Sequence, residues 1–171
     1  MEGKRPPDQL INQVTWKIPN ALALVGSRSD EEWNAMTTSW ITQVSMEPVL
    51  VGVGVDNSSV TRRLISRGGA FSINLWSAAD TKTFVKFSKP ATRKGLTLNG
   101  RPIREGVTGV PVFEEAVAWM ELRVHSSIDF GTHTFFVGEI VEAGLDQDYE
   151  GSVAAMSDTR MKYGGVKRGG H

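Results

Sequence analysis

The sequence contains no cysteine, which excludes disulfide bonds, thiolate metal sites, iron–sulfur clusters and cysteine nucleophiles. Its histidines, His125, His133 and His171, are too scattered for the i, i+4 spacing of a helical zinc site. We therefore expect no metal centre and no thiol chemistry.

The sequence also has no excess of charge of either sign. Lysine plus arginine number 19, as do aspartate plus glutamate, so no global field attracts nucleic acid or an anionic membrane. The opening MEGKRPPDQL has no apolar run and matches neither a signal peptide nor a membrane anchor. We expect a cytoplasmic protein that binds neither nucleic acid nor membrane.

Familiar nucleotide-binding and catalytic motifs are missing as well. GVGVDN resembles a dinucleotide fingerprint, but Asn57 stands where the third glycine belongs, and no GxxxxGK[ST] loop is present. The acidic pair Glu114 and Glu115 is consecutive and has no evident partner for acid–base catalysis. These absences favour either a binding protein or an enzyme whose chemistry is carried by a cofactor.

The patterns that are present predict a mainly β fold. With 171 residues, 40% of them hydrophobic, and neither linker nor repeat, we expect one domain over residues 1–171, with a mobile start and tail. Apolar or alternating runs predict strands, and helical spacing between capping residues and glycine or proline predicts short helices. The expected strands are 21–26, 36–45, 49–55, 70–75, one beginning at 117 and 133–143, and the expected helices are 60–69 and 78–88.

The strongest local signal is the string DNSSVTRRL. Asn57, Ser58, Ser59 and Thr61 open a helix whose free backbone N–H groups and dipole favour an anion such as a phosphate. The same residues also fit a plain helix cap with solvated arginines. Local pattern alone leaves both interpretations open.

Five strings in one order give a more specific indication: NAMTTSW, MEPVLVGVGV, NSSVTRRLI, GGAFSINL and GTHTFFVGEIVEA. With them the chain resembles the flavin reductase-like family of FMN-binding split barrels over residues 21–143. The resemblance implies a mainly β split β-barrel with short helices and Greek-key-like antiparallel strands. It also implies a homodimer that binds FMN near the subunit interface.

The resemblance further implies positions for the cofactor. The binding segment starts at Asn34, the ring is lined by the strand 36–40, and the phosphate is held by residues 57–61 with help from the looser match FSKPATRK. Asn74 is implied near the ribityl chain, and His133 is implied near the nicotinamide or substrate. The implied cofactor residues are Asn34, Met36, Thr37, Thr38, Ser39, Trp40, Asn57, Ser58, Ser59, Thr61, Asn74, Ser88, Lys89 and Lys94.

By resemblance, the expected activity is an FMN-dependent NAD(P)H oxidoreductase of the flavin reductase or ferric reductase type. NADH or NADPH is the expected cosubstrate, and free flavin, a ferric complex or a redox protein is the expected acceptor. The first alternative is a non-enzymatic FMN-binding electron carrier or flavin sensor, since no nicotinamide-specific motif is present. A barrel of this kind that binds another ligand is the second.

Overall fold

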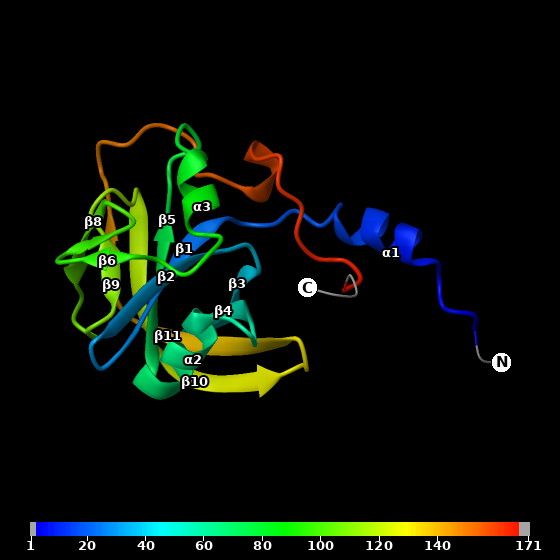
Figure 1. Cartoon of the computed structure of the whole chain (residues 1–171), viewed down its shortest axis with the longest axis horizontal. Helices are drawn as coiled ribbons and strands as arrows, with labels where there is room; N and C mark the ends of the chain where they lie inside the picture. The colour runs from blue at the N-terminus through cyan, green and yellow to red at the C-terminus, as the bar shows by residue number, and fades with distance from the viewer. Residues whose placement is uncertain (1–2, 168–171) are drawn as a thin grey trace.

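The computed structural model describes residues 3–167, and most of its regular structure is β-strand (Figure 1). The larger sheet has seven strands in the order β2-β1-β5-β10-β11-β4-β3, and all neighbouring pairs are antiparallel. Its strands are β1 (Ala23–Ser29), β2 (Glu32–Thr38), β3 (Ile41–Met46), β4 (Val49–Asp56), β5 (Ala70–Leu75), β10 (Ala118–Asp129) and β11 (His133–Leu145).

A second, four-stranded sheet and short helices complete the fold. The smaller sheet comprises β6 (Arg93–Lys94), β7 (Thr97–Leu98), β8 (Arg101–Glu105) and β9 (Pro111–Phe113). The helices are α1 (Asp8–Thr15), α2 (Val60–Gly68), α3 (Lys82–Lys86) and a 3-10 turn, η1 (Met156–Asp158). Within residues 3–167, no helix is both long and apolar enough to cross a membrane.

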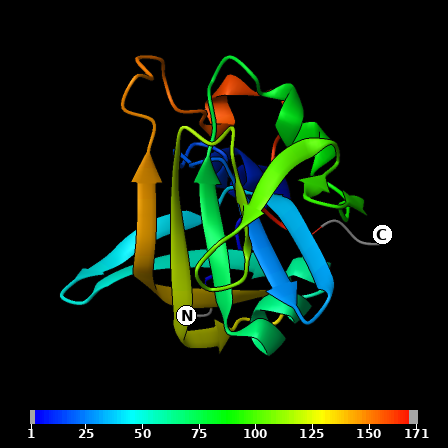
Figure 2. The same cartoon turned by 90° about the vertical axis from the view of Figure 1, so that its left-hand side faces the viewer.

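The larger sheet is a barrel that does not close. Its edge strands β2 and β3 are joined by only Ser39 and Trp40, yet no ladder pairs them within the described residues. The sheet therefore curves so that its two edge strands come together at this link without pairing. The β3–β4 hairpin extends outward (Figure 2). This arrangement confirms the expected mainly β, split-barrel fold, and it leaves a gap that other segments line.

Alternation along the strands builds an apolar core on each face of the sheet. On β1, Ala23 and Val25 face a cluster that includes Ile65 of α2, whereas Leu24 faces an aromatic cluster that includes Phe113 of β9. Because both faces of β1 are covered there, its first four residues, ALVG, form an apolar run. Its pairing with β2 thus places that strand rigidly beside the gap.

Several expected elements are confirmed. Strands at 49–55, 70–75 and 133–143, and the strand that begins near 117, correspond to β4, β5, β11 and β10. The helix expected at 60–69 is α2, while α3 occupies only part of 78–88.

Other expected elements differ. The single strand expected at 36–45 is two strands, because the chain changes from one sheet edge to the other at Ser39 and Trp40. The strand expected at 21–26 is β1, which begins at Ala23 and extends to Ser29, since Asp30 adopts a positive φ of 52° and lets Ser29 pair with Glu32. Strands β6 to β9 were missed because each has too few residues to show a period, and helix α1 was missed as well.

Helix α1 projects from the barrel, and the C-terminal segment runs beside it (Figure 1). Asn12 Oδ1 accepts a hydrogen bond from Val166 N at 2.7 Å, and Lys162 lies over the Trp16 ring. The expectation of a mobile start and tail also concerns residues 1–2 and 168–171, which lie outside the described residues.

Candidate functional site

A cavity of about 620 Å³ lies where the barrel is split, a volume typical of small-molecule sites. Its wall comes from β2 and the link after it, the start of α2, the segment after α3, and the C-terminal segment. The lining residues are Leu22, Asn34, Met36, Thr37, Thr38, Ser39, Gly54, Asp56, Ser58, Ser59, Val60, Thr61, Phe87, Ser88, Lys89, Pro90, Met156, Met161, Lys162 and Tyr163.

One wall of the cavity is rich in hydroxyl groups. Thr37 Oγ1 donates to the Phe84 carbonyl at 2.7 Å, and Thr37 N donates to the Phe87 carbonyl, so this part of β2 is fixed to α3. Thr38 Oγ1 is buried and has no hydrogen-bond partner among the described residues. Because an unsatisfied buried hydroxyl costs free energy, Thr38 is suited to a polar ligand in the cavity.

A second wall is the N-terminus of α2. Ser59 caps this nine-residue helix, and its Oγ accepts from Arg62 N at 3.1 Å. The backbone N–H groups of Val60 and Thr61 then lack intrahelical acceptors, and they stand at the positive end of the helix dipole. Lys89 lines the same cavity and adds a positive charge, so this end of the site suits an anion.

Asn34 joins the start of α2 to the segment after α3. Its Nδ2 donates to Thr61 Oγ1 at 3.0 Å, and its Oδ1 accepts from Ala91 N at 2.7 Å. The residue is only 3% exposed, so its bond to Thr61 is shielded from water. Asn34 thus fixes α2 relative to the 88–91 segment.

Beside the cavity, three aromatic side chains form a cluster: Trp40, His133 and Tyr163. The Tyr163 hydroxyl lies 2.6 Å from His133 Nε2, and the Trp40 ring centroid lies 4.7 Å from that of His133 and 5.0 Å from that of Tyr163. Burial lowers the pKa of His133 and raises the pKa of Tyr163. The phenol and the imidazole are therefore both neutral at neutral pH, and the tautomer of His133 sets which of them donates.

The structure brings ten of the sequence-predicted residues to the cavity wall. They are Asn34, Met36, Thr37, Thr38, Ser39, Ser58, Ser59, Thr61, Ser88 and Lys89. These come from three separate segments, and pairing of β1 with β2 and packing of α2 on β1 assemble them.

Five predicted residues do not line this cavity. Trp40 packs behind it against Gly54, and His133 lies behind Tyr163. Asn57 connects strands instead, because its amide bonds to Asp129 and Gly131 and accepts from Thr134.

The remaining two are farther from the wall. Asn74 is fully buried and its amide is used within the core: it donates to the Leu24 carbonyl and to Ser72, and accepts from Phe113 N. Lys94 is exposed on β6. The sequence around Asn74 and Lys94 does not show whether either side chain faces a ligand.

Sequence reasoning missed the C-terminal wall, which is formed by Met156, Met161, Lys162 and Tyr163. The only signal there was a tyrosine followed by two glycines in a hydrophilic tail.

Sequence reasoning also missed Asp56, whose Oδ1 accepts from the backbone and the hydroxyl of Ser58. Burial raises the pKa of Asp56, but these hydrogen bonds together with the charges of His133 and Lys167 lower that pKa overall. Residues 3–167 contain no cluster of side chains suited to a metal ion.

Comparison with known proteins gives a consistent result. Residues 16–165 match the family model described as "Flavin reductase like domain". A ferric-chelate reductase (NAD(P)H) of Archaeoglobus fulgidus is 30% identical over 140 residues, which cover 81% of this chain and 83% of that protein.

Solved structures extend the comparison. NADH:FAD oxidoreductase SgcE6 of Streptomyces globisporus superposes with a TM-score of 0.74 at 25% identity, covering 88% of this chain and 91% of that one. An FMN-binding protein of Thermus thermophilus with bound p-hydroxybenzaldehyde gives a TM-score of 0.70 at 26% identity, covering 90% and 83%.

Proposed function

Because the chain belongs to the flavin reductase-like family, we propose that it is an FMN-dependent NAD(P)H oxidoreductase of the flavin reductase or ferric reductase type. The cavity at the split of the barrel would hold FMN, which would supply the hydride and electron transfer between NADH or NADPH and an acceptor.

The observation that carries the proposal is the composition of this one cavity. An anion-binding helix N-terminus and a hydroxyl-lined wall with an unpartnered buried Thr38 lie in the same hollow. A phosphorylated ligand with a polar ring system has matching groups at both places. FMN has a phosphate and a hydrogen-bonding ring.

At the phosphate end, the Thr61 hydroxyl has no acceptor among the described residues and is free to donate, and Val60 and Thr61 offer backbone N–H groups. The Ser58 and Ser59 hydroxyls donate to Asp56, so they would turn from Asp56 to contact the phosphate. Ser88 and Lys89 approach from the opposite segment and complete the cradle. Asn74 and Lys94 are left out of this proposal, because their positions do not reach the cavity. Asn57 acts indirectly, by holding the loop that precedes α2.

At the ring end, Met36 to Ser39 line the flavin. The Thr38 hydroxyl gains the partner that it lacks, while Met36, Leu22 and Phe87 supply apolar contact. His133 stays proposed as a contact to nicotinamide or substrate, reached past Tyr163. The chain's task is to orient two reactants and exclude water, which requires no catalytic carboxylate pair.

The proposed partners are a second copy of the chain and a small acceptor: free flavin, a ferric complex or a redox protein. Exposed apolar side chains on the β3–β4 hairpin, Val44, Met46 and Val49, support self-association. A location in the cytoplasm belongs to the same proposal.

The test is optical. Purified protein loaded with FMN is titrated anaerobically with NADH and then, in a separate sample, with NADPH. Bleaching of the visible flavin band by either nucleotide is expected. If neither nucleotide bleaches the band, the chain is not a nicotinamide-dependent reductase.

The alternative is an electron carrier or flavin sensor, favoured by the exposure of the cavity-lining segment that holds Ser88 and Lys89 and by the lack of a nicotinamide motif. Multiple turnovers of NADH or NADPH oxidation with an added acceptor would exclude it. A colourless protein that fails to bind added FMN would instead indicate a barrel of this family with another ligand.

A further inference from the structure

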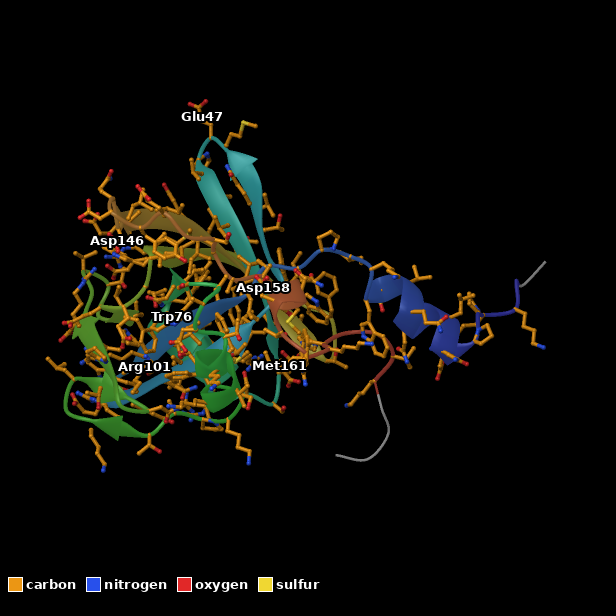
Figure 3. The ribbon with its side chains drawn as sticks, turned by 90° about the horizontal axis from the view of Figure 1, so that it is seen from above. Glu47, Trp76, Arg101, Asp146, Asp158 and Met161 are labelled. Carbon is orange, nitrogen blue, oxygen red and sulfur yellow. The ribbon has the colours of Figure 1, made fainter. Side chains whose placement is uncertain are left out.

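The C-terminal segment 161–166 forms one side of the cavity, although it follows the last strand of the barrel. Met161, Lys162 and Tyr163 all line the cavity. Met161 lies on the side of the barrel that faces α1 (Figure 3), and the segment passes between barrel and helix in Figure 1.

The chain before this segment is fixed to the barrel. Residues Val153 and Ala155 form β-bridges with Ser77 and Ala21, and Met156 N donates to the Asn20 carbonyl. After Thr159, no backbone-to-backbone hydrogen bond holds the described part of the tail. Residues 160–167 are therefore held by side-chain contacts, which makes their release less costly than the opening of a ladder.

Within the described part of the chain, three hydrogen bonds join residues 163–166 to other elements, and only one of them adjoins the cavity. The Tyr163 hydroxyl bonds to His133 at 2.6 Å. Farther along, Trp16 Nε1 donates to the Gly164 carbonyl at 3.3 Å, and Val166 N donates to Asn12 Oδ1 at 2.7 Å.

The path of the segment at this point depends on two glycines. Gly164 and Gly165 have φ values of 96° and 86°, which side-chain-bearing residues rarely adopt. A Cβ at Gly164 would also press on Trp40, and one at Gly165 would overlap Asn12. The chain thus turns sharply away from the cavity immediately after placing Tyr163 against His133 and Trp40.

On the basis of the FMN site proposed above, we propose that residues 161–164 belong to the flavin site and that the contact between Tyr163 and His133 is a latch that sets how long FMN stays bound. The cavity wall formed by this segment must move aside for a ligand to leave in its direction. Loss of the latch, or of a tail anchor outside the cavity, therefore speeds release without removing any group from the phosphate cradle.

Two variants and a matched control test the latch. Tyr163→Phe removes the hydroxyl and keeps the ring on Trp40, and Asn12→Ala releases the tail at a residue that does not line the cavity. The control is Tyr149→Phe, which removes the other tyrosine hydroxyl of the chain, bonded to Ser77 and Ser152 away from the cavity.

The first measurement is the rate of FMN release after dilution of loaded protein, followed by the recovery of flavin fluorescence. Tyr163→Phe and Asn12→Ala are each expected to release FMN roughly three- to tenfold faster, as the loss of one hydrogen bond predicts. Tyr149→Phe is expected to match the wild type. The second measurement is amide hydrogen exchange, which FMN is expected to slow in residues 161–166.

Failure of the latch and failure of the FMN site are distinguishable. If the wild type binds FMN but both variants release it at the wild-type rate, the latch is wrong and the FMN site stands. Equal acceleration in the Tyr149→Phe control also overturns the latch, since it indicates general loosening. A wild type that binds no FMN overturns both proposals.

Discussion

At the scale of single residues, Asn34 makes the most specific prediction. Asn34→Ala removes the acceptor of Ala91 N and the donor to Thr61 Oγ1 inside a buried site. Each orphaned group costs roughly 1–3 kcal/mol, so unfolding by urea should occur at a lower midpoint.

The same substitution should weaken FMN binding, because α2 and the 88–91 segment are no longer held together. The control is Asn20→Ala, whose exposed amide bonds only to the Ile18 carbonyl. Equal effects of the two substitutions on FMN affinity would contradict the role of Asn34.

His133 makes a second residue-scale prediction, on pH. Burial lowers its pKa in the folded protein below the ordinary 6.5, and Asp56 opposes this only in part. The unfolded chain therefore binds a proton more readily than the folded one. The stability that His133 contributes is fully present above pH 6.5 and is lost as the pH falls from 6.5 towards the folded pKa.

The urea midpoint should therefore decrease as the pH falls through this range, and His133→Gln should make this decrease smaller. Of the groups near the imidazole, Tyr163 has a pKa raised by burial and Asp56 has a pKa lowered from 3.8, so neither titrates in the same range. A slope that persists in His133→Gln would assign it to another group.

At the scale of elements, α2 serves both the fold and the site. Ser59→Ala removes the cap of Arg62 N and should cost about 1 kcal/mol of stability. It should also weaken FMN binding, because a frayed first turn presents its N–H groups poorly. Thermal unfolding and flavin titration measure the two effects.

A matched control exists at α3. Its N-cap residue, Thr81, makes no side-chain hydrogen bond to the helix, so Thr81→Ala should change neither stability nor FMN affinity appreciably. If Ser59→Ala leaves FMN affinity as unchanged as Thr81→Ala does, the start of α2 is not the phosphate site.

At the scale of the whole molecule, ligand binding should raise the stability of the barrel. The cavity wall combines β2, α2, the 88–90 segment and the tail, so a ligand there adds contacts to all four parts at once. FMN at roughly 100 times its Kd should add about 2.7 kcal/mol to the free energy of unfolding.

Riboflavin provides the comparison, because it has the same ring but no phosphate. It should raise the melting temperature less than FMN at equal concentration, since it leaves the helix N-terminus and Lys89 unused. Equal stabilisation by both ligands would mean that the phosphate is not bound at α2.

The sequence by itself determined the features that depend on neighbours along the chain. Alternation identified most long strands of the barrel, and Ser59 followed by an amphipathic run and glycine identified α2 with its cap. The ordered strings identified the family, and with it ten residues that line the cavity. A single domain over residues 1–171 stays a prediction.

Only the tertiary structure decided which of the polar residues meet. Asn34 and Asn74 both lie in strands and are both buried, but one joins the elements at the cavity and the other bonds within the core. The tail joined the site through Tyr163, which meets His133 across 30 positions of the chain. Contacts at such separation are set by how the sheet curves and where its edges part, and a local pattern contains neither.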